Sequence, residues 1–422
     1  MALSPAVNTP AVRRAVPGRI RLILLLGAMV ALGPLTIDMY LPALPRIADE
    51  LRVSSSVVQL TLTGTLAGLA IGQLVVGPLS DSLGRRRPLL AGIALHIAAS
   101  LLCVAATNVT LLGIARGLQG MGAAAATVVA IAVVGDLFRD TQAATMMSRL
   151  MLVLGAAPVL APSLGAVVLL HGSWHWVFVA LGVLAAALLA VAAVALPETL
   201  DVAHRRPLRV RAIGATYAEL LRDAKFLTLV LVGALGMAGL FAYISAASFV
   251  LQGRFGLDQQ TFALVFGAGA VAVISATQVN VVLLRRFSPQ RIVATALAAG
   301  AVGSIVFVAL AVTATGGIAG FLVPVWVVLA AMGLVIPNAP ALALSRHGDA
   351  AGTAAALLGA GQFGLGAAVA PLVGVLGNDA VALAAVVLAT TVTGLLAFVA
   401  VMRRDGVSAG NSVAEGEKVN LR

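Results

Sequence analysis

The chain has 422 residues, of which 61% are hydrophobic and only 10% are charged, and its mean hydropathy is +1.07. Soluble domains are about 45–50% apolar and about 25% charged, so this composition excludes a soluble globular protein. The single cysteine, Cys103, excludes a disulfide framework or a cluster of thiolate metal ligands.

Apolar stretches of about 20 residues recur along the whole chain, and each can cross a hydrocarbon core about 30 Å thick as a helix. They are continuously apolar, whereas the strands of a membrane barrel alternate apolar and polar residues. The sequence therefore predicts an all-α membrane protein with twelve transmembrane helices, the first of them retained rather than cleaved as a signal. We expect these helices at residues 21–44, 57–79, 88–106, 110–135, 147–170, 174–196, 226–250, 261–284, 291–313, 318–341, 352–376 and 380–402.

The basic residues indicate how the helices are oriented. With the N-terminus in the cytoplasm, 23 of the 27 lysines and arginines fall in the tails and loops of the cytoplasmic side. Only Arg46, Arg52 and Arg254 fall outside, and Arg116 is embedded. Because cytoplasmic loops are enriched in Lys and Arg, we predict a multi-pass protein of the bacterial inner membrane with both termini in the cytoplasm. This distribution explains the net charge of +11 without a nucleic-acid partner.

The longest polar connection, from Pro197 to Lys225, divides the predicted helices into six plus six. The stretches APSLG at 161–165 and APLVG at 370–374 place similar residues in the fifth and eleventh helices. These helices correspond only if the halves share one orientation, so we predict two pseudo-symmetric six-helix bundles. The predicted domains are a cytoplasmic tail at 1–19, bundles at 20–196 and 226–402, a cytoplasmic loop at 197–225, and a disordered cytoplasmic tail at 403–422.

The loop after the second helix reads GPLSDSLGRRRPL, from Gly77 to Leu89. Its glycines allow a tight turn and a close approach of helices. Its acidic and basic residues can form a charge network at the cytoplasmic helix ends, with Asp136 as a partner for Arg85. We interpret this network as a conformational latch, and the alternative is charge that only orients the loop. The latch residues are Gly77, Asp81, Gly84, Arg85, Arg86 and Asp136.

This loop resembles the signature of the major facilitator superfamily, in which G-x-L-x-D-R-x-G-R-[RK] recurs. The matching positions are Gly77, Leu79, Asp81, Gly84, Arg85 and Arg86, and Ser82 stands where an arginine is usual. The resemblance implies a transporter whose two halves surround a central cavity.

Asp38 and Arg116 are the acid and the base that we place well inside the membrane. Each lies six residues from the outer end of its predicted helix, so both are about 9 Å deep at about 1.5 Å per residue. An arginine at the bilayer centre costs about 2.5–3.5 kcal/mol on insertion scales, so Arg116 should face the interior and have a partner. We predict that the two groups face each other or a shared cavity, where Asp38 exchanges protons as the conformation changes. The alternative is a buried pair with a structural role.

The fifth predicted helix contains GAAPVLAPSLG, from Gly155 to Gly165. Small residues permit close packing, and prolines bend a helix. The stretch resembles the proline and glycine motif of drug antiporters in the same superfamily. The predicted helix-bending residues are Gly155, Pro158, Pro162 and Gly165.

Five stretches together resemble the bicyclomycin and chloramphenicol resistance (Bcr/CflA) branch of drug:proton antiporters. They are GPLTIDMYLPALPRIADEL, VQLTLTGTLAGLAIGQLVVGPLSD, APVLAPSLG, LPETL and FAYISAASFVLQGRFGL. The resemblance implies export of small amphipathic drugs driven by inward proton flow, with proton handling at Asp38 and Arg116. It also implies arginines late in the fourth helix, where this chain has Ile131 and Gly135.

Polar and aromatic side chains on otherwise apolar helices are candidates for the substrate cavity, and the alternative for each is a hydrogen bond between helices. They are Tyr40, Gln73, Gln119, Tyr243, Ser245, Ser248 and Gln252. We interpret His96 as packed and neutral. His171 and His175, beside two tryptophans, are expected in an aromatic belt at the outer interface rather than in a metal site.

The sequence shows no nucleophile with a base, no metal-ligand cluster and no phosphate-binding loop, so we do not expect an enzyme. It shows no selectivity repeat of a channel either. We predict a secondary active transporter that exports small amphipathic drugs in exchange for protons by alternating access and needs no cofactor. The alternative is a proton-coupled exporter of a metabolite such as a sugar or an amino acid. The expected partners are drugs, protons and the lipid bilayer, with the protein acting as a monomer.

Overall fold

The computed structural model describes residues 19–205, 207, 210–345 and 351–419. The predicted tail at 1–19 lies outside this part of the chain except for its last residue, and so do positions 206, 208 and 209 of the predicted central loop. Every element in the described part is helical, and twelve helices there are long and apolar enough to cross a membrane. The prediction of an all-α protein with twelve spans is confirmed.

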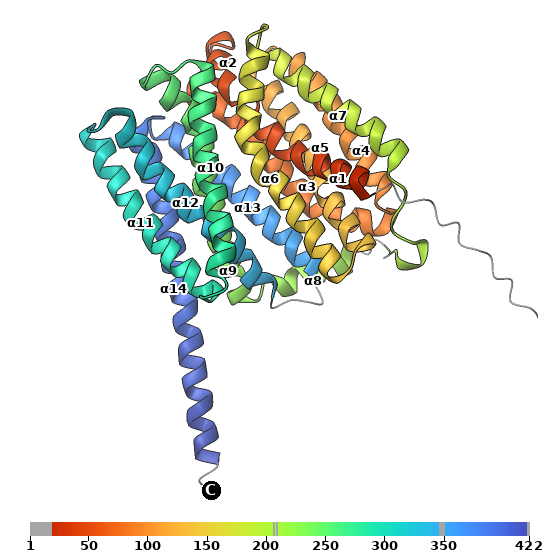
Figure 1. The fold of residues 1–422 in the computed structure, drawn as a ribbon, viewed down its shortest axis with the longest axis vertical. Coiled ribbons are helices and arrows are strands. Elements are labelled where there is room, and N and C mark those ends of the chain that lie inside the picture. Colours follow the sequence, from red (N-terminus) through yellow and green to blue (C-terminus); the bar gives the residue numbers. More distant parts are fainter. Residues whose placement is uncertain (1–18, 206, 208–209, 346–350, 420–422) are drawn as a thin grey trace, which may run out of the picture.

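The long helices run side by side in a bundle, with α8 at one end of the bundle and α2 at the other (Figure 1). In chain order the elements are α1 (Arg19–Asp38), η1 (Leu41–Ala43), α2 (Leu44–Glu50), α3 (Ser55–Leu83), α4 (Arg86–Val104), α5 (Val109–Leu137), α6 (Asp140–Leu169), α7 (His175–Ala195), η2 (Val202–His204), α8 (Val210–Leu220), α9 (Ala224–Ser248), η3 (Phe249–Arg254), α10 (Gln259–Leu283), α11 (Pro289–Thr313), α12 (Gly317–Leu344), α13 (Ala351–Val375) and α14 (Ala380–Val419).

Several helices begin where a short polar side chain can cap them. Ser54, Asn108 and Ser288 each accept a hydrogen bond from the backbone N–H three residues later, at 3.4, 2.9 and 3.3 Å. Such caps satisfy N–H groups that have no partner within the helix. The short connections therefore end at defined residues, and α3, α5 and α11 start within two residues of their predicted starts.

The first predicted helix ends earlier than expected. We predicted one helix over 21–44, but α1 ends at Asp38 and is followed by the 3₁₀ turn η1 and the short helix α2. Pro42 explains the difference, because a proline inside a helix clashes with the carbonyl of the fourth residue before it, which here is Asp38. Asp38 therefore lies at the C-terminal end of α1, not six residues inside a longer helix.

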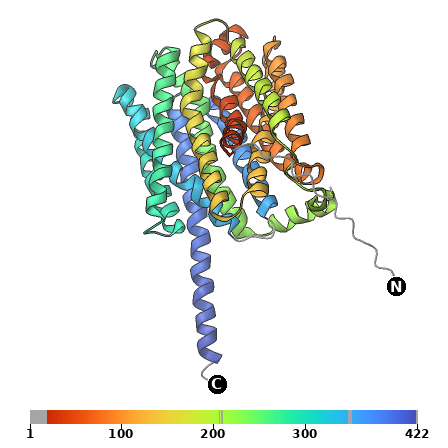
Figure 2. The same ribbon diagram turned by 45° about the vertical axis from the view of Figure 1, so that its right-hand side comes forward.

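Three further boundaries differ from the prediction. The α6 helix begins at Asp140 rather than at residue 147, and the predicted loop at 197–225 contains η2 and α8. The α14 helix continues to Val419, past the predicted end at 402, and Figure 2 shows it projecting beyond the other helices. No proline, which would interrupt the helix, occurs between Ala380 and Val419.

The long helices pack as two sets that meet along two pairs of helices. In the first set α3, α4 and α1 pack against α5, and α1 also packs against α6. In the second set α9 packs against α13 and α14, and α11 packs against α12 and α14. The sets meet mainly where α3 contacts α13 and where α6 contacts α10.

Glycines bring α3 and α5 into backbone contact. A Cβ on Gly68 would collide with the carbonyl of Gly117, and a Cβ on Gly64 would collide with the carbonyl of Gly113. Small residues allow membrane helices to approach this closely, and the packing role expected for the α3 glycines agrees with these contacts. Because Arg116 belongs to α5, the contact between α3 and α5 also determines the position of the Arg116 side chain.

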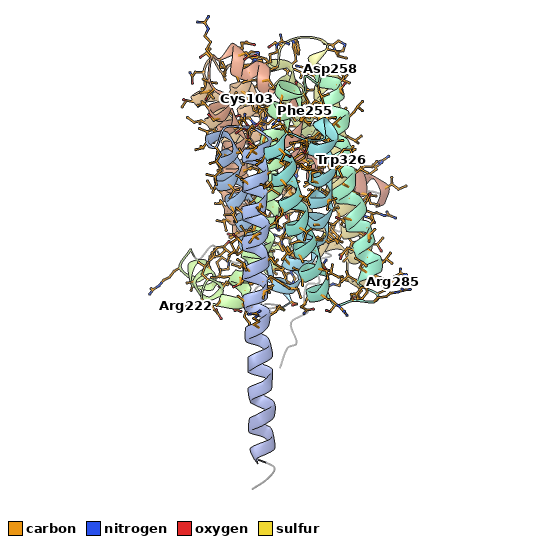
Figure 3. The ribbon with its side chains drawn as sticks, turned by 90° about the vertical axis from the view of Figure 1, so that its left-hand side faces the viewer. Cys103, Arg222, Phe255, Asp258, Arg285 and Trp326 are labelled. Carbon is orange, nitrogen blue, oxygen red and sulfur yellow. The ribbon has the colours of Figure 1, made fainter. Side chains whose placement is uncertain are left out.

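The outer surface of the helices is apolar. Large hydrophobic side chains such as Leu24 and Val183 are 67% and 64% exposed. Charged side chains lie at the ends instead, where Figure 3 places Arg222 and Arg285 at one end and Asp258 at the other. A surface of this kind is stable when lipid covers it. The chain is therefore a multi-pass membrane protein.

Candidate functional site

Asp38 is a buried acid at the end of α1. Its side chain is 2% exposed, and its Oδ1 atom has no hydrogen-bond partner among the described residues. The neighbouring backbone is closely packed, because a Cβ on Gly165 of α6 would collide with the carbonyl of Met39. An ionised carboxylate buried without a partner is costly, so this environment makes the charge state of Asp38 sensitive to its surroundings.

Arg116 of α5 is fully buried and binds the same end of α1. Its Nη2 atom donates to the carbonyl of Thr36 at 2.8 Å, and its Nη1 atom donates to Gln119 Oε1 at 2.6 Å. Its Cζ atom lies 4.1 Å from the ring centroid of Tyr40. The last carbonyls of a helix have no partner within the helix, so the guanidinium acts as a cap for α1.

The structure thus brings Asp38 and Arg116 to one helix end without joining them by an ion pair among the described residues. Arg116 contacts residues 36 and 40, which flank Asp38 on either side. Counting residues along a helix gives a depth but not the side toward which a group points. The sequence therefore located both groups at one level but could not show that Arg116 binds the backbone of α1.

A series of hydrogen bonds connects Arg116 to α4. Gln119 Nε2 donates to Ser100 Oγ at 2.8 Å, and Ser100 Oγ donates to the carbonyl of His96 at 2.7 Å. His96 Nε2 is hydrogen-bonded to Thr36 Oγ1 at 2.9 Å. The series begins and ends at α1 and links it to α4 and α5. His96 is fully buried and packed, as the sequence suggested.

Sequence reasoning missed Thr36 and Ser100 in this series. Thr36 lies two residues before Asp38, and Ser100 lies four residues after His96, which is the spacing of neighbours on one face of a helix. Serine and threonine are common hydrogen-bonding groups between membrane helices. The i, i+4 spacing of Ser100 from His96 was the signal that could have identified it.

The predicted latch forms a charge network. Arg85 Nε donates to Asp136 Oδ2 at 2.9 Å and Arg85 Nη2 donates to Asp136 Oδ1 at 3.2 Å, while Arg85 Nη1 donates to Asp81 Oδ1. Burial alone would lower the pKa of Arg85, but the hydrogen bonds and charges of Asp136 and Asp81 raise it above its ordinary value. The expected partnership of Arg85 with Asp136 is confirmed, and the latch role stays a prediction.

Glu198 completes the network and was not identified from the sequence. Its carboxylate accepts hydrogen bonds from the backbone N–H groups of Arg85 and Arg86 at 2.8 and 3.3 Å, at the start of α4. Gly84 has φ +89°, and a Cβ there would collide with the Glu198 carboxylate. A negative group is favourable at a helix N-terminus. Glu198 lies 113 residues after Arg85, so no local spacing indicated this contact.

We expect Asp136→Asn to lower the stability of the protein by weakening the charge network around Arg85. The substitution keeps the shape of the side chain but removes the charge that pairs with Arg85. Its apparent melting temperature in detergent should fall below that of Asp140→Asn, which changes an exposed aspartate at the start of α6. A double-mutant cycle with Arg85→Gln should give a coupling of about 0.5–3 kcal/mol. Additive losses in the cycle would contradict the predicted partnership.

Three of the predicted cavity residues make hydrogen bonds within the protein. The side-chain amide of Gln119 accepts a hydrogen bond from Arg116 and donates one to Ser100. Ser248 Oγ donates to the carbonyl of Leu41 at 2.7 Å, and Gln252 Nε2 donates to the carbonyl of Pro42 at 3.3 Å. The last two bonds join η1 to α9 and η3. Polar side chains on membrane helices commonly find such partners, so these bonds agree with the alternative of a hydrogen bond between helices, and a cavity role for the three residues stays a prediction.

The other four predicted cavity residues have different surroundings. The Tyr40 ring lies under Arg116, and the side chain of Gln73 is next to Gly359 of α13, where a Cβ would be 3.1 Å from Gln73 Cδ. Ser245 is fully buried, and its carbonyl accepts a hydrogen bond from Gln59 at 3.1 Å. Tyr243 Oη is buried and has no partner among the described residues.

The four predicted helix-bending residues all lie in α6, where the two prolines affect the backbone and the two glycines allow close packing. Pro158 and Pro162 both lie inside α6, where each removes a backbone hydrogen bond. Gly165 allows α6 to reach the carbonyl of Met39, beside Asp38, and Gly155 faces Ile274 of α10. The motif therefore lies where α6 contacts both the acidic site and the second set of helices.

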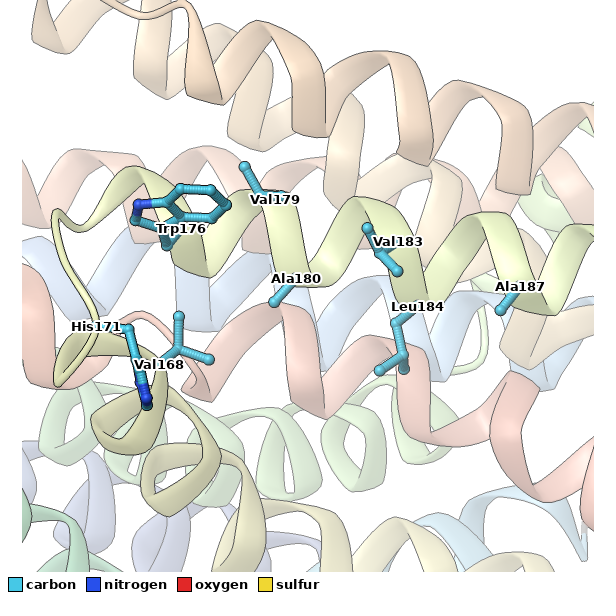
Figure 4. A pocket seen from close by; sticks show the side chains of 8 residues that line it. All are labelled: Val168, His171, Trp176, Val179, Ala180, Val183, Leu184 and Ala187. Atoms are coloured by element: carbon cyan, nitrogen blue, oxygen red, sulfur yellow. The ribbon is translucent and has the colours of Figure 1, made fainter.

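A groove with a volume of about 540 Å³ lies between α6 and α7 (Figure 4). Its lining is almost entirely apolar and includes exposed side chains that face the membrane. It consists of Val168, His171, Trp176, Val179, Ala180, Val183, Leu184 and Ala187. Trp176, Val183 and Leu184 of this lining are exposed, so the groove belongs to the lipid-facing surface, and its lining includes none of the predicted cavity residues.

The chain is similar to known membrane transporters. Residues 24–371 match the family model described as Major Facilitator Superfamily. The chain is 37% identical to the uncharacterized MFS-type transporter YdgK of Bacillus subtilis, over 90% of this chain and 95% of that protein. It is 32% identical to the bicyclomycin resistance protein homolog of Haemophilus influenzae, over 85% of this chain and 90% of that protein.

A solved structure has the same fold. The crystal structure of a D-xylose-proton symporter superposes with a TM-score of 0.71 and covers 89% of this chain and 97% of its own. Its sequence identity is 16%, so this similarity concerns the fold alone.

Proposed function

The chain belongs to the Major Facilitator Superfamily, and from that premise we propose that it exports small amphipathic drugs from the cytoplasm in exchange for protons. It is a multi-pass membrane transporter for small molecules and not an enzyme. The name of the Haemophilus influenzae relative, a bicyclomycin resistance protein homolog, supports drugs as the substrate class. The basic residues of the tails and loops support an orientation with both termini in the cytoplasm of a bacterial cell.

The observation that carries the proposal is the buried carboxylate of Asp38, whose Oδ1 atom has no partner in the described part of the chain. Inside a membrane protein an ionisable residue is expensive and commonly serves transport of protons or ions. A protonated carboxyl is neutral and tolerates this environment, whereas the ionised form needs a positive or hydrogen-bonding partner. Arg116, which already binds α1 beside Asp38, supplies positive charge at that position.

Proton exchange at Asp38 would act directly on the end of α1. Arg116 donates a hydrogen bond to the carbonyl of Thr36. An ionised Asp38 would attract the guanidinium of Arg116 and compete with this bond, whereas a protonated Asp38 would not. The η1 segment begins three residues after Asp38 and is tied to α9 and η3 of the second set by the bonds from Ser248 and Gln252. A ligand shifts a conformational equilibrium only through different interactions in the two states, and we expect these contacts to be the ones that differ.

The proposed cycle follows from this arrangement. A proton entering from outside neutralises Asp38 and favours the state that opens toward the cytoplasm after drug release. Binding of drug from the cytoplasm favours release of that proton into the cytoplasm. It then favours return to the state that opens toward the outside. Alternating access of this type is the mechanism expected for a transporter built from two helical sets around one site.

The test is drug accumulation in bacterial cells that lack their own efflux pumps. Cells that express the chain should accumulate less chloramphenicol than cells with an empty vector, and a protonophore should abolish the difference. A panel of chemically distinct antibiotics, with sugars and amino acids as competitors, defines the substrate class. Unchanged accumulation across the whole panel would contradict drug export, and competition by a metabolite alone would favour metabolite export.

A further inference from the structure

Two hydrogen-bond donors in the second set of helices point to one place and have no partner among the described residues. Tyr243 of α9 is 3% exposed and its Oη atom is buried, and Trp326 of α12 has a buried Nε1 atom. A Cβ on Gly269 of α10 would lie 3.1 Å from Tyr243 Oη and 3.3 Å from Trp326 Nε1. Figure 3 shows Trp326 between Asp258 at one end of the bundle and Arg285 at the other.

The surroundings of these donors are aromatic and apolar. The ring of Phe266 stacks on Tyr243, with centroids 5.4 Å apart and an angle of 11° between the planes. Leu329 closes the same place from α12, with its Cδ1 atom 3.3 Å from a Cβ on Gly269. Buried polar groups are nearly always hydrogen-bonded, and leaving one unpaired costs free energy. Two unpaired donors at one point therefore indicate that an acceptor joins them at some stage of the transport cycle.

The position of the donors also suits a substrate site. Tyr243 lies five residues before Ser248, which binds the carbonyl of Leu41 in η1. Both α9 and α10 contact η1, the segment that follows Asp38. An occupant of the Tyr243 region would thus act on helices that touch the proposed proton site.

We propose that Tyr243, Trp326 and the side-chain-free position of Gly269 form the part of the substrate site that recognises a hydrogen-bond acceptor, which we call the acceptor site. The substrate class is a compound with a flat apolar body and a carbonyl, nitro or similar oxygen. That oxygen accepts hydrogen bonds from Tyr243 Oη and Trp326 Nε1, and the body packs against Phe266. Gly269 is required because a side chain there would crowd both donors, with its Cβ 3.1 Å from Tyr243 Oη and 3.3 Å from Trp326 Nε1. The inference rests on the proposed drug export and adds the chemistry of the substrate.

The experiment is equilibrium binding of two radiolabelled probes to the purified full chain in detergent, without a proton gradient. Chloramphenicol carries amide and nitro oxygens, whereas tetraphenylphosphonium is aromatic and has no acceptor. Tyr243→Phe and Trp326→Phe each remove one donor and keep an aromatic ring. Each should weaken chloramphenicol binding about 3- to 10-fold, as expected for loss of one hydrogen bond, and leave tetraphenylphosphonium binding unchanged.

Gly269→Ala tests whether crowding of the two donors weakens binding, and Gly236→Ala of α9 is its control. A Cβ on Gly236 would be 3.6 Å from its nearest neighbour, Val335 Cγ1, which is an ordinary contact. Gly269→Ala should weaken chloramphenicol binding at least as much as either loss of a donor, whereas Gly236→Ala should bind both probes as the wild type does. Melting temperatures of all variants verify that the fold is retained.

Each other outcome identifies which proposal fails. Wild-type affinity for chloramphenicol in both Tyr243→Phe and Trp326→Phe would overturn the acceptor site, and so would an equal loss of both probes. Wild-type protein that binds tetraphenylphosphonium but not chloramphenicol would overturn the acceptor site and leave drug export standing. Binding that follows the expected pattern, in a protein that shows no proton-dependent export, would uphold the acceptor site and overturn the proposed function. Binding of neither probe would overturn both.

Discussion

Asp38→Asn is expected to abolish proton-coupled drug transport. In proteoliposomes that contain the wild-type chain, addition of drug should move protons across the membrane, and an internal pH dye reports this movement. The variant keeps the size of the side chain but cannot gain or lose a proton. Its drug-dependent pH change should therefore fall to that of protein-free liposomes. Exchange of labelled for unlabelled drug across the membrane should persist, because it needs no net proton movement.

Asp49→Asn is the matched control for this result. Asp49 belongs to α2, eleven residues after Asp38, and is exposed rather than buried. The Asp49→Asn variant should transport protons and drug as the wild type does. Undiminished proton movement in Asp38→Asn would remove Asp38 from the mechanism. Loss of drug exchange together with proton movement would instead show that the substitution damages the fold.

Arg116→Lys is expected to reduce proton-driven drug transport about 10- to 100-fold, although it keeps the positive charge. The guanidinium donates to two separate acceptors, the carbonyl of Thr36 and the amide of Gln119, and stacks on Tyr40. A lysine cannot reproduce this planar geometry. A hydrogen bond to a charged group contributes about 1.5–3 kcal/mol, which corresponds to the expected loss. Initial rates of drug uptake into everted membrane vesicles measure the effect.

Arg46→Lys is the control for Arg116→Lys. Arg46 is exposed on α2 and makes one hydrogen bond, to the carbonyl of Gly172 at 3.3 Å. This variant should transport at the wild-type rate. Wild-type transport by Arg116→Lys would show that only the positive charge matters, and the described role of Arg116 in holding the end of α1 would then be wrong.

Hydropathy and charge predicted the helices well because the bilayer imposes one length and one composition on every span. The break after Asp38 was missed although Pro42 and Pro45 signalled it, because the apolar run continues through η1 without interruption. Hydropathy measures whether a residue tolerates lipid, and it does not measure whether the backbone can stay helical.

The candidate site was predictable in its residues but not in its contacts. Charged groups are so rare within the spans that Asp38 and Arg116 were conspicuous, and Arg85 with Asp136 could be paired for the same reason. The uncharged partners were harder to identify. Thr36 and Ser100 are common residue types in membrane helices, and Gln119 was named without its bonds to Arg116 and Ser100. Contacts such as Glu198 with Arg85 or Tyr243 with Gly269 join distant parts of the chain, and only the packing of the helices brings them together.

The most direct measurement of the central claim is infrared difference spectroscopy of the carboxyl groups when drug binds. A protonated carboxyl has a carbonyl stretching band that an ionised carboxylate lacks. Addition of drug to the wild-type chain at constant pH should reduce this band as Asp38 loses its proton, and Asp38→Asn should show no such change. A wild-type protein without any change in the band, or an equal change in Asp38→Asn, would contradict proton exchange at Asp38.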